Sequence, residues 1–350
     1  MRGTLAADVT ITAGPEEATA PSLTTRIFTR RTVISLVAAL LIVVIAIWRS
    51  GINWGDAWDH IRHANLRLYL LAVVVYYSGY AVRALRWQLL LRNAGERCPY
   101  VSLFETLTVS FFVNCIVPAK MGDLYRAFLL RTRERVSALK AFGTIIFERL
   151  LDLFVLMSML LIAGGLTFRN RVPSAFIPYA VGGGGLCLIG GVILAVMTLG
   201  RGQRLLRYLP DPVLQRYEVF RIGAVQSMGR WGEIVPLSVL VWAIEAGRLA
   251  CIVFALGDGD LLSPANFLVV ALVAALLTTV PFLPGGLGLV EGGMVVVLQQ
   301  VASVGQSQAV AIALLDRSVS YGTLLVVGFG LFLVSHVKTA RLSLVDTTST

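Results

Sequence analysis

The strongest constraint in this 350-residue sequence is a series of long apolar runs with few charged residues. About 20 apolar residues, rising 1.5 Å each, span the hydrocarbon core of a bilayer. One such run would fit a buried helix of a soluble protein, but five or more would not. The series therefore predicts a helical membrane protein without a soluble catalytic domain. The clearest runs are Thr32–Trp48, Leu66–Val82, Ala175–Leu199, Ile234–Leu256 and Pro264–Val280.

The charge pattern supports a membrane protein rather than a protein that binds nucleic acid. Charged residues make up 14% of the chain, against about 25% in a soluble domain, and the formal net charge is +10. The basic residues cluster between the apolar runs, as expected for topology determinants and contacts with anionic lipid headgroups. The four cysteines lack paired spacing, so neither a disulfide framework nor a metal site is expected. We find no nucleotide-binding motif and expect no cofactor.

The distribution of positive charge also predicts the topology. Arg26, Arg30 and Arg31 precede the first apolar run, which places the N-terminus in the cytoplasm. We expect a disordered tail over residues 1–25, one transmembrane domain over 26–340, and a cytoplasmic C-terminal tail over 341–350. Within that domain, residues 200–232 are expected to form a basic cytoplasmic linker. The predicted full spans are 32–48, 66–90, 141–165, 175–199, 234–256 and 308–335.

Two further apolar segments, 101–135 and 264–301, are interrupted by proline and glycine. Each is predicted to form a helical hairpin, either re-entrant or made of two short spans. The first contains Val117-Pro118-x-x-x-Gly122 and the second Val280-Pro281-x-x-x-Gly285. An acid–Arg pair follows each, first Glu148-Arg149 and then Asp316-Arg317. Because three full spans separate the hairpins, the second copy would be inverted, which is the pattern of inverted-repeat transporters.

Several ionisable residues fall inside the predicted membrane helices. Such a residue costs roughly 2.5–3.5 kcal/mol at the helix centre, so it survives when paired or when facing a polar cavity. Half-helices that start at the hairpin turns would direct backbone N–H groups towards an anion, and a phosphate fits best. Structural ion pairs and simple turn glycines remain the alternatives. The candidate substrate-binding residues are Lys120, Asp123, Arg126, Glu148, Arg149, Asp152, Gly285, Gly286, Gly288, Glu291 and Arg317.

These candidates have different expected roles. Arg126, Arg149 and Arg317 would hold the phosphate. Glu148, Asp152 and Glu291 would balance these charges and carry protons.

Four ordered motifs resemble those of a known family. They are Arg83-Ala-Leu-Arg86-Trp87, Asn114-x-x-x-Pro118-x-x-x-Gly122-Asp123-x-x-Arg126, Phe147-Glu148-Arg149-Leu-Leu-Asp152, and Pro281-x-x-Pro284-Gly-Gly-Leu-Gly288-x-x-Glu291. Together they resemble the transmembrane domain of lysylphosphatidylglycerol synthases, a flippase-like family, over roughly residues 30–335. Asp123 stands where that family usually has Glu. The chain ends shortly after Lys338, so the resemblance implies the lipid-translocating part without the soluble aminoacyl-transferase domain.

The sequence therefore predicts an all-α polytopic protein with six full spans and two hairpins in an inverted repeat. The expected function is a flippase, not an enzyme, that moves an anionic lipid between the leaflets of a bacterial inner membrane. A membrane-embedded transferase acting on lipid-linked phosphate or sugar is the main alternative, and a scaffold protein is the other. The expected partners are the membrane and an anionic lipid, with no nucleic acid. The oligomeric state stays open, with a homodimer as one possibility.

Overall fold

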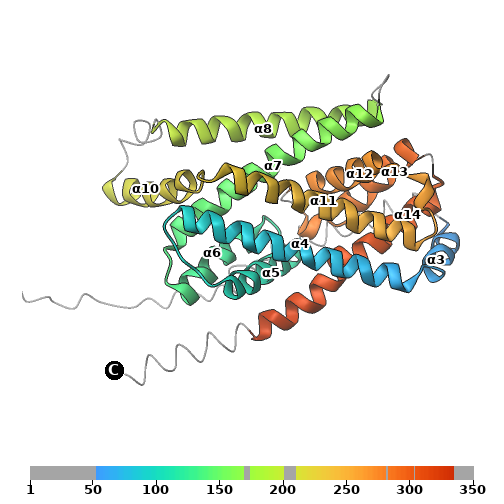
Figure 1. Ribbon diagram of the computed structural model, residues 1–350, viewed down its shortest axis with the longest axis horizontal. Coiled ribbons are helices and arrows are strands. Elements are labelled where there is room, and N and C mark those ends of the chain that lie inside the picture. The colour runs from blue at the N-terminus through green and yellow to red at the C-terminus, as the bar shows by residue number, and fades with distance from the viewer. Residues whose placement is uncertain (1–52, 169–173, 201–209, 281–282, 303, 335–350) are drawn as a thin grey trace, which may run out of the picture. The chain divides into compact units, whose positions relative to one another are not determined.

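The computed structural model describes residues 53–168, 174–200, 210–280, 283–302 and 304–334 (Figure 1). Within these ranges the chain forms eleven α-helices and no strand, which confirms the predicted all-α class. The predicted first span, 32–48, and both predicted tails lie outside the described residues. The helices are α3 (Trp54–Arg62), α4 (Leu66–Asn93), α5 (Tyr100–Ile116), α6 (Met121–Glu134), α7 (Ala138–Thr167), α8 (Ile177–Thr198), α10 (Asp211–Gln226), α11 (Trp231–Ala255), α12 (Pro264–Thr278), α13 (Leu289–Ala302) and α14 (Gln306–Arg317).

Six helical stretches in the described residues are long and apolar enough to cross a membrane. Five of them coincide with predicted full spans: α4, α7, α8, α11 and the stretch Gln306–Val334 that begins with α14. The sixth, Pro284–Ala302, is the second arm of the second predicted hairpin. It combines α13 with the short 3-10 turn Pro284–Gly286, inside which Gly285 has a non-helical conformation. The protein is thus a multi-pass helical membrane protein.

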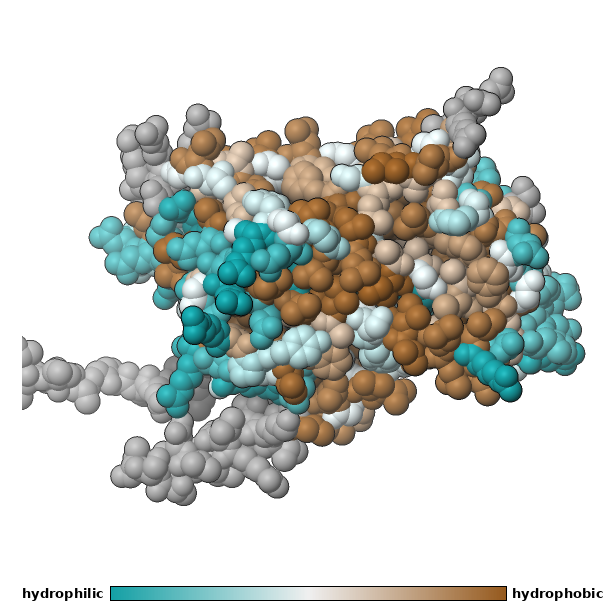
Figure 2. Space-filling model, viewed as in Figure 1, coloured by the Kyte–Doolittle hydropathy of each residue, from teal (hydrophilic) through white to brown (hydrophobic). Residues whose placement is uncertain are grey.

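Helix α4 shows how the sequence directs one face inward and another outward. Asn65 caps its N-terminus by accepting hydrogen bonds from the backbone N–H groups of Arg67 and Leu68. Tyr76, Tyr80 and Arg83 follow the helical repeat on one face and are buried. Leucine and valine side chains on the other faces are exposed, as expected where a helix meets lipid. On the side shown in Figure 2, such residues form a hydrophobic band between two hydrophilic ends.

Contacts between helix termini define these two ends of the bundle. At one end, the Asn65 N–H donates to the Ala255 carbonyl at 2.7 Å, and Thr167 is hydrogen-bonded to Asn266 at 3.0 Å. These contacts join the start of α4 to the end of α11, and the end of α7 to the start of α12. At the other end, Lys140 donates to Glu96 at 2.7 Å, which joins the start of α7 to the loop after α4.

Helices α5 and α6 form the first predicted hairpin. Residues Ala119 and Lys120 at its tip have positive φ angles, so α6 starts sharply after the turn. The Asn114 side chain accepts a hydrogen bond from the Gly122 N–H at 2.8 Å. A Cβ atom on Gly122 would overlap the Ser110 carbonyl oxygen, so glycine permits the close approach of the two helices.

Helices α12 and α13 form the second hairpin, which starts from the opposite end of the bundle (Figure 1). Its turn needs glycine because Gly285, Gly286 and Gly288 all have positive φ angles. The tips of the two hairpins meet: a Cβ atom on Gly285 would lie 3.6 Å from the Cα atom of Cys115. Opposed hairpins are what an inverted repeat requires, but the repeat itself stays a prediction.

The predicted basic linker contains helix α10, whose residues lie against α7. Gly143 and Gly223 mediate this contact, since a Cβ atom on either would overlap backbone atoms of the other helix. Arg221 also donates to the Met197 carbonyl at 3.0 Å, which ties α10 to the end of α8. Residues 201–209 of the predicted linker lie outside the described residues.

Candidate functional site

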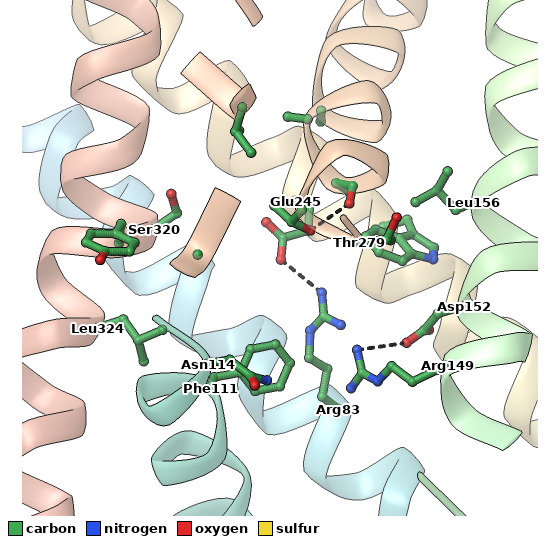
Figure 3. Close-up of a pocket in the computed structure, with 18 of the residues that line it drawn as sticks. Arg83, Phe111, Asn114, Arg149, Asp152, Leu156, Glu245, Thr279, Ser320 and Leu324 are labelled. Carbon is green, nitrogen blue, oxygen red and sulfur yellow. Dashed lines mark hydrogen bonds and ion pairs between the residues drawn. The ribbon is translucent and has the colours of Figure 1, made fainter. Parts of the chain in front are cut away.

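A cavity of about 500 Å³ lies between the hairpin tips and the surrounding helices (Figure 3). Its ionisable residues sit near the middle of α4, α7, α11 and the stretch 306–334, or at the hairpin tips. The cavity is therefore far from both hydrophilic ends of the bundle. The charged side chains that line it are Arg83, Lys120, Asp123, Arg149, Asp152, Glu245, Arg248, Asp316 and Arg317.

Two of the lining arginines are tightly paired with carboxylates. Glu245 accepts from Arg83 at 3.0 Å and from Arg248 at 3.2 Å, so it bridges α4 and α11. Arg248 also pairs with Asp316, which links α11 to α14. All four side chains are buried or nearly so. Their charges are largely neutralised by one another, and they hold three helices around the cavity.

Arg317 is hydrogen-bonded to the second hairpin. It donates to the Glu291 carboxylate and to the Gly285 carbonyl, both at 2.7 Å. The other Glu291 oxygen accepts from the Gly288 N–H at 2.6 Å. The N–H of Gly288 is thus already bonded within the turn, as is that of Gly286, which donates to Leu283. These contacts favour the alternative that Gly286 and Gly288 serve the turn.

A second charged cluster is buried in the wall of the cavity, and of its carboxylates Asp152 reaches the cavity itself. Arg86 pairs with both oxygens of Asp152, donates to Glu148 at 2.8 Å and donates to Ser238 at 2.9 Å. Arg126 pairs with Glu148 at 2.9 Å and lies over the Trp87 ring at 3.6 Å. Neither Arg126 nor Glu148 lines the cavity. The cavity as described therefore does not include Arg126, and its expected role as a phosphate ligand stays a prediction.

Arg149 differs from the other arginines because its partners are distant. The nearest atoms of Asp123, Glu148 and Asp152 lie 3.7, 3.9 and 3.9 Å away. Its Nε and Nη2 atoms have no hydrogen-bond partner among the described residues, and its side chain is 33% exposed. Arg149 lines the cavity, and its guanidinium group points into it (Figure 3), although the Nε and Nη2 atoms themselves are buried.

Lys120, at the tip of the first hairpin, is the second loosely held cation of the cavity. Within the described part of the chain no carboxylate lies within 4.0 Å of its ammonium group. Asn114 and Asp123 line the cavity beside it. Arg149 and Lys120 together give this side of the cavity uncommitted positive charge, which suits an anion.

The rest of the cavity wall is aromatic and aliphatic. Aromatic rings come from Tyr76, Tyr80, Phe111, Trp242 and Tyr321, and four of these rings lie within 6 Å of an arginine guanidinium carbon. Most of the aliphatic side chains come from α7, α8 and α12, with Val290 from α13 and Leu324 from the stretch 306–334. The described residues contain no cluster of His, Cys, Asp or Glu able to hold a metal ion. The cavity therefore suits an amphipathic anion.

The structure thus brings together about half of the predicted site residues. Those that line the cavity are Lys120, Asp123, Arg149, Asp152, Gly285 and Arg317, whereas Arg126, Glu148, Gly286, Gly288 and Glu291 do not line it. The structure adds Arg83, Glu245, Arg248 and Asp316 to the residues that line the cavity, and Arg86 to the buried cluster in its wall. A signal was present: Arg83 continues the helical face of Tyr76 and Tyr80, so it had to share their buried environment.

Comparisons with known proteins agree with this architecture. The family described as "Lysylphosphatidylglycerol synthase TM region" matches residues 35–328. A UPF0104 membrane protein of Methanocaldococcus jannaschii is 29% identical over 226 residues, which cover 64% of this chain and 94% of that protein. Another UPF0104 membrane protein, from Methanothermobacter thermautotrophicus, is 28% identical over 83% of this chain and 89% of its own length. Glycosyltransferase AglD of Haloferax volcanii is 24% identical over 89% of this chain, which spans 55% of AglD.

Proposed function

Because the chain belongs to the lysylphosphatidylglycerol synthase transmembrane-region family, we propose that it moves a lipid with an anionic phosphate headgroup between membrane leaflets. The observation that carries this proposal is the state of Arg149, which lines the cavity with a partly exposed side chain and whose nearest carboxylate oxygen lies 3.7 Å away. A planar guanidinium with free N–H groups matches the oxygen geometry of a phosphate. The cavity also combines charge with an apolar wall, which a soluble anion would not need.

In this mechanism the loosely held cations have a different role from the arginines that are tightly paired with carboxylates. Arg149 donates to two phosphate oxygens, and Lys120 adds a point charge from the hairpin tip. The tightly paired Arg83, Arg248 and Arg317 keep their carboxylate partners and hold the walls in place. Because the site lies between opposed hairpins, rocking of one half of the bundle against the other would expose it to either leaflet in turn.

The proposal is tested in proteoliposomes that contain fluorescent phosphatidylglycerol. Wild-type protein is expected to accelerate the loss of leaflet asymmetry, and Arg149→Gln and Lys120→Gln to slow it. Each hydrogen bond to a charged group contributes about 1.5–3 kcal/mol, so each variant should slow transport about 10- to 100-fold. The matched control is Arg230→Gln, since Arg230 is an exposed cation away from the cavity. Equal rates for wild type and empty vesicles would refute the proposal.

A second candidate is a membrane-embedded transferase, favoured by the similarity to a protein named glycosyltransferase AglD. Asp123 and Asp152 line the cavity and would be the available acid–base residues. This function predicts a chemically changed lipid when purified protein is incubated with a labelled lipid-linked phosphate and a sugar donor. Recovery of unchanged lipid, together with its redistribution between leaflets, would favour transport.

We further propose that the end of the bundle formed by the α4 C-terminus and the first hairpin faces the cytoplasm, in a bacterial inner membrane. This end carries Arg92, Arg97, Arg131 and Arg135, whereas the loops at the opposite end carry acidic residues such as Asp258. Cytoplasmic loops are enriched in Arg and Lys. Both chain termini would then be cytoplasmic.

A further inference from the structure

The cavity extends to the outer surface of the bundle beside α8. Leu186 of α8 lines the cavity, and yet 45% of its surface is exposed. A residue with both properties marks a place where the cavity opens. Because α8 is apolar and long enough to span the membrane, this opening faces hydrocarbon rather than water.

The helix surface one turn before Leu186 is open. A Cβ atom on Gly182, which shares the helix face of Leu186, would meet nothing within 4 Å, so this part of α8 borders open space. Across the cavity α12 contributes small residues, and α7 contributes long aliphatic ones. These lining residues are Ala271, Ala274 and Ala275 of α12, and Ile146, Leu150, Leu153 and Leu156 of α7.

This apolar slot is continuous with the charged part of the cavity. On α7, Leu150 and Leu153 follow Arg149 and Asp152 directly in sequence, and all four line the same cavity. The helix therefore presents an apolar stripe next to a charged stripe. An amphipathic molecule bound along α7 would place its anionic group beside Arg149 and its apolar part towards α8.

We propose that the slot between α7, α8 and α12 holds a hydrocarbon tail of the lipid whose phosphate lies beside Arg149. The inference rests on the proposed function and assigns the part of the site that receives the tail. A tail that moves from lipid into this slot passes from one apolar environment to another, so no hydrophobic free energy is gained. What the slot provides is a path on which the tail avoids the charged side chains.

A matched pair of cysteine variants tests the slot. In a background with Cys98, Cys115, Cys187 and Cys251 replaced by alanine, Leu186→Cys or Leu188→Cys is labelled with an N-octyl maleimide. Both leucines are exposed residues of α8, but only Leu186 lines the cavity. The adduct at position 186 is expected to slow lipid translocation at least tenfold, and the adduct at 188 to leave it unchanged. Equal effects of the two adducts would overturn the proposal.

A second measurement uses wild-type protein and does not require transport. Phosphatidylglycerol with a diazirine in its acyl chain is photo-crosslinked in proteoliposomes, and the labelled peptides are sequenced. Label is expected on α12 at Ala271 and Ala274, which are 5% and 8% exposed and are reached through the slot. Label confined to outward-facing residues would overturn the slot. Failure of wild-type protein to move lipid, with α12 still labelled, would instead overturn the proposed transport.

Discussion

Two neighbouring arginines should respond in opposite ways to the same substitution. Arg86 is fully buried and bonded to Asp152, Glu148 and Ser238, so Arg86→Met would leave two buried carboxylates with weakened partners. Breaking a buried ion pair in this way costs about 3–5 kcal/mol, a large fraction of a stability of about 5–15 kcal/mol. Arg149 has distant partners and a partly exposed side chain, so Arg149→Met should cost about 1 kcal/mol.

The free energies of unfolding can be measured by steric trapping in micelles, and lipid translocation in proteoliposomes. We expect Arg86→Met to lose stability, and Arg149→Met to keep stability but lose translocation. Adding Asp152→Asn to Arg86→Met should recover part of the loss, because it removes one uncompensated charge while Glu148 keeps Arg126. Equal destabilisation by both single substitutions would refute the division between a structural and a ligand-binding arginine.

Two other predictions address the first hairpin and the topology. Gly122→Ala should destabilise the protein by about 1–3 kcal/mol, because the added methyl group would overlap the Ser110 carbonyl. Gly184→Ala serves as the control, since its added Cβ atom would meet nothing within 4 Å. Equal unfolding free energies for the two variants would contradict the packing of the first hairpin. In cells that express the protein with its four native cysteines replaced, a membrane-impermeant maleimide should label Asp56→Cys from outside but Arg92→Cys only after permeabilisation. The reverse pattern would contradict the proposed orientation.

The helices and their breaks were predictable because each depends on local chemistry. A run of apolar residues as long as 66–82 has few alternatives to a membrane helix. The breaks at 117–120 and 284–288 were predictable because proline removes a backbone donor and glycine permits positive φ angles. The structure confirms both breaks, with α6 starting at Met121 and α13 at Leu289.

The assignment of individual charges was less predictable, because it depends on which helices surround each residue. Arg126 and Arg149 both lie near the first break, and the sequence alone predicts both as phosphate ligands. In the folded chain Trp87 and Glu148 enclose Arg126, while Arg149 lines the cavity with a partly exposed side chain. Likewise, Arg83 and Arg86 are basic residues near the end of an apolar run, which is also the pattern of a topology signal. Their burial follows from carboxylates on α7 and α11, and these are distant in sequence.

The lengths of the hairpin helices explain why the cavity lies deep in the bundle. Helices α5 and α12 contain 17 and 15 residues, which correspond to about 25 and 22 Å at 1.5 Å per residue. Neither covers the roughly 30 Å of hydrocarbon, but each reaches beyond the middle from its own side. Their tips therefore meet in the interior, where Tyr321 donates a hydrogen bond to the Cys115 carbonyl at 3.0 Å. A headgroup bound beside these tips would be about 15 Å from either interface, so the proposed translocation divides one long polar crossing into two short ones.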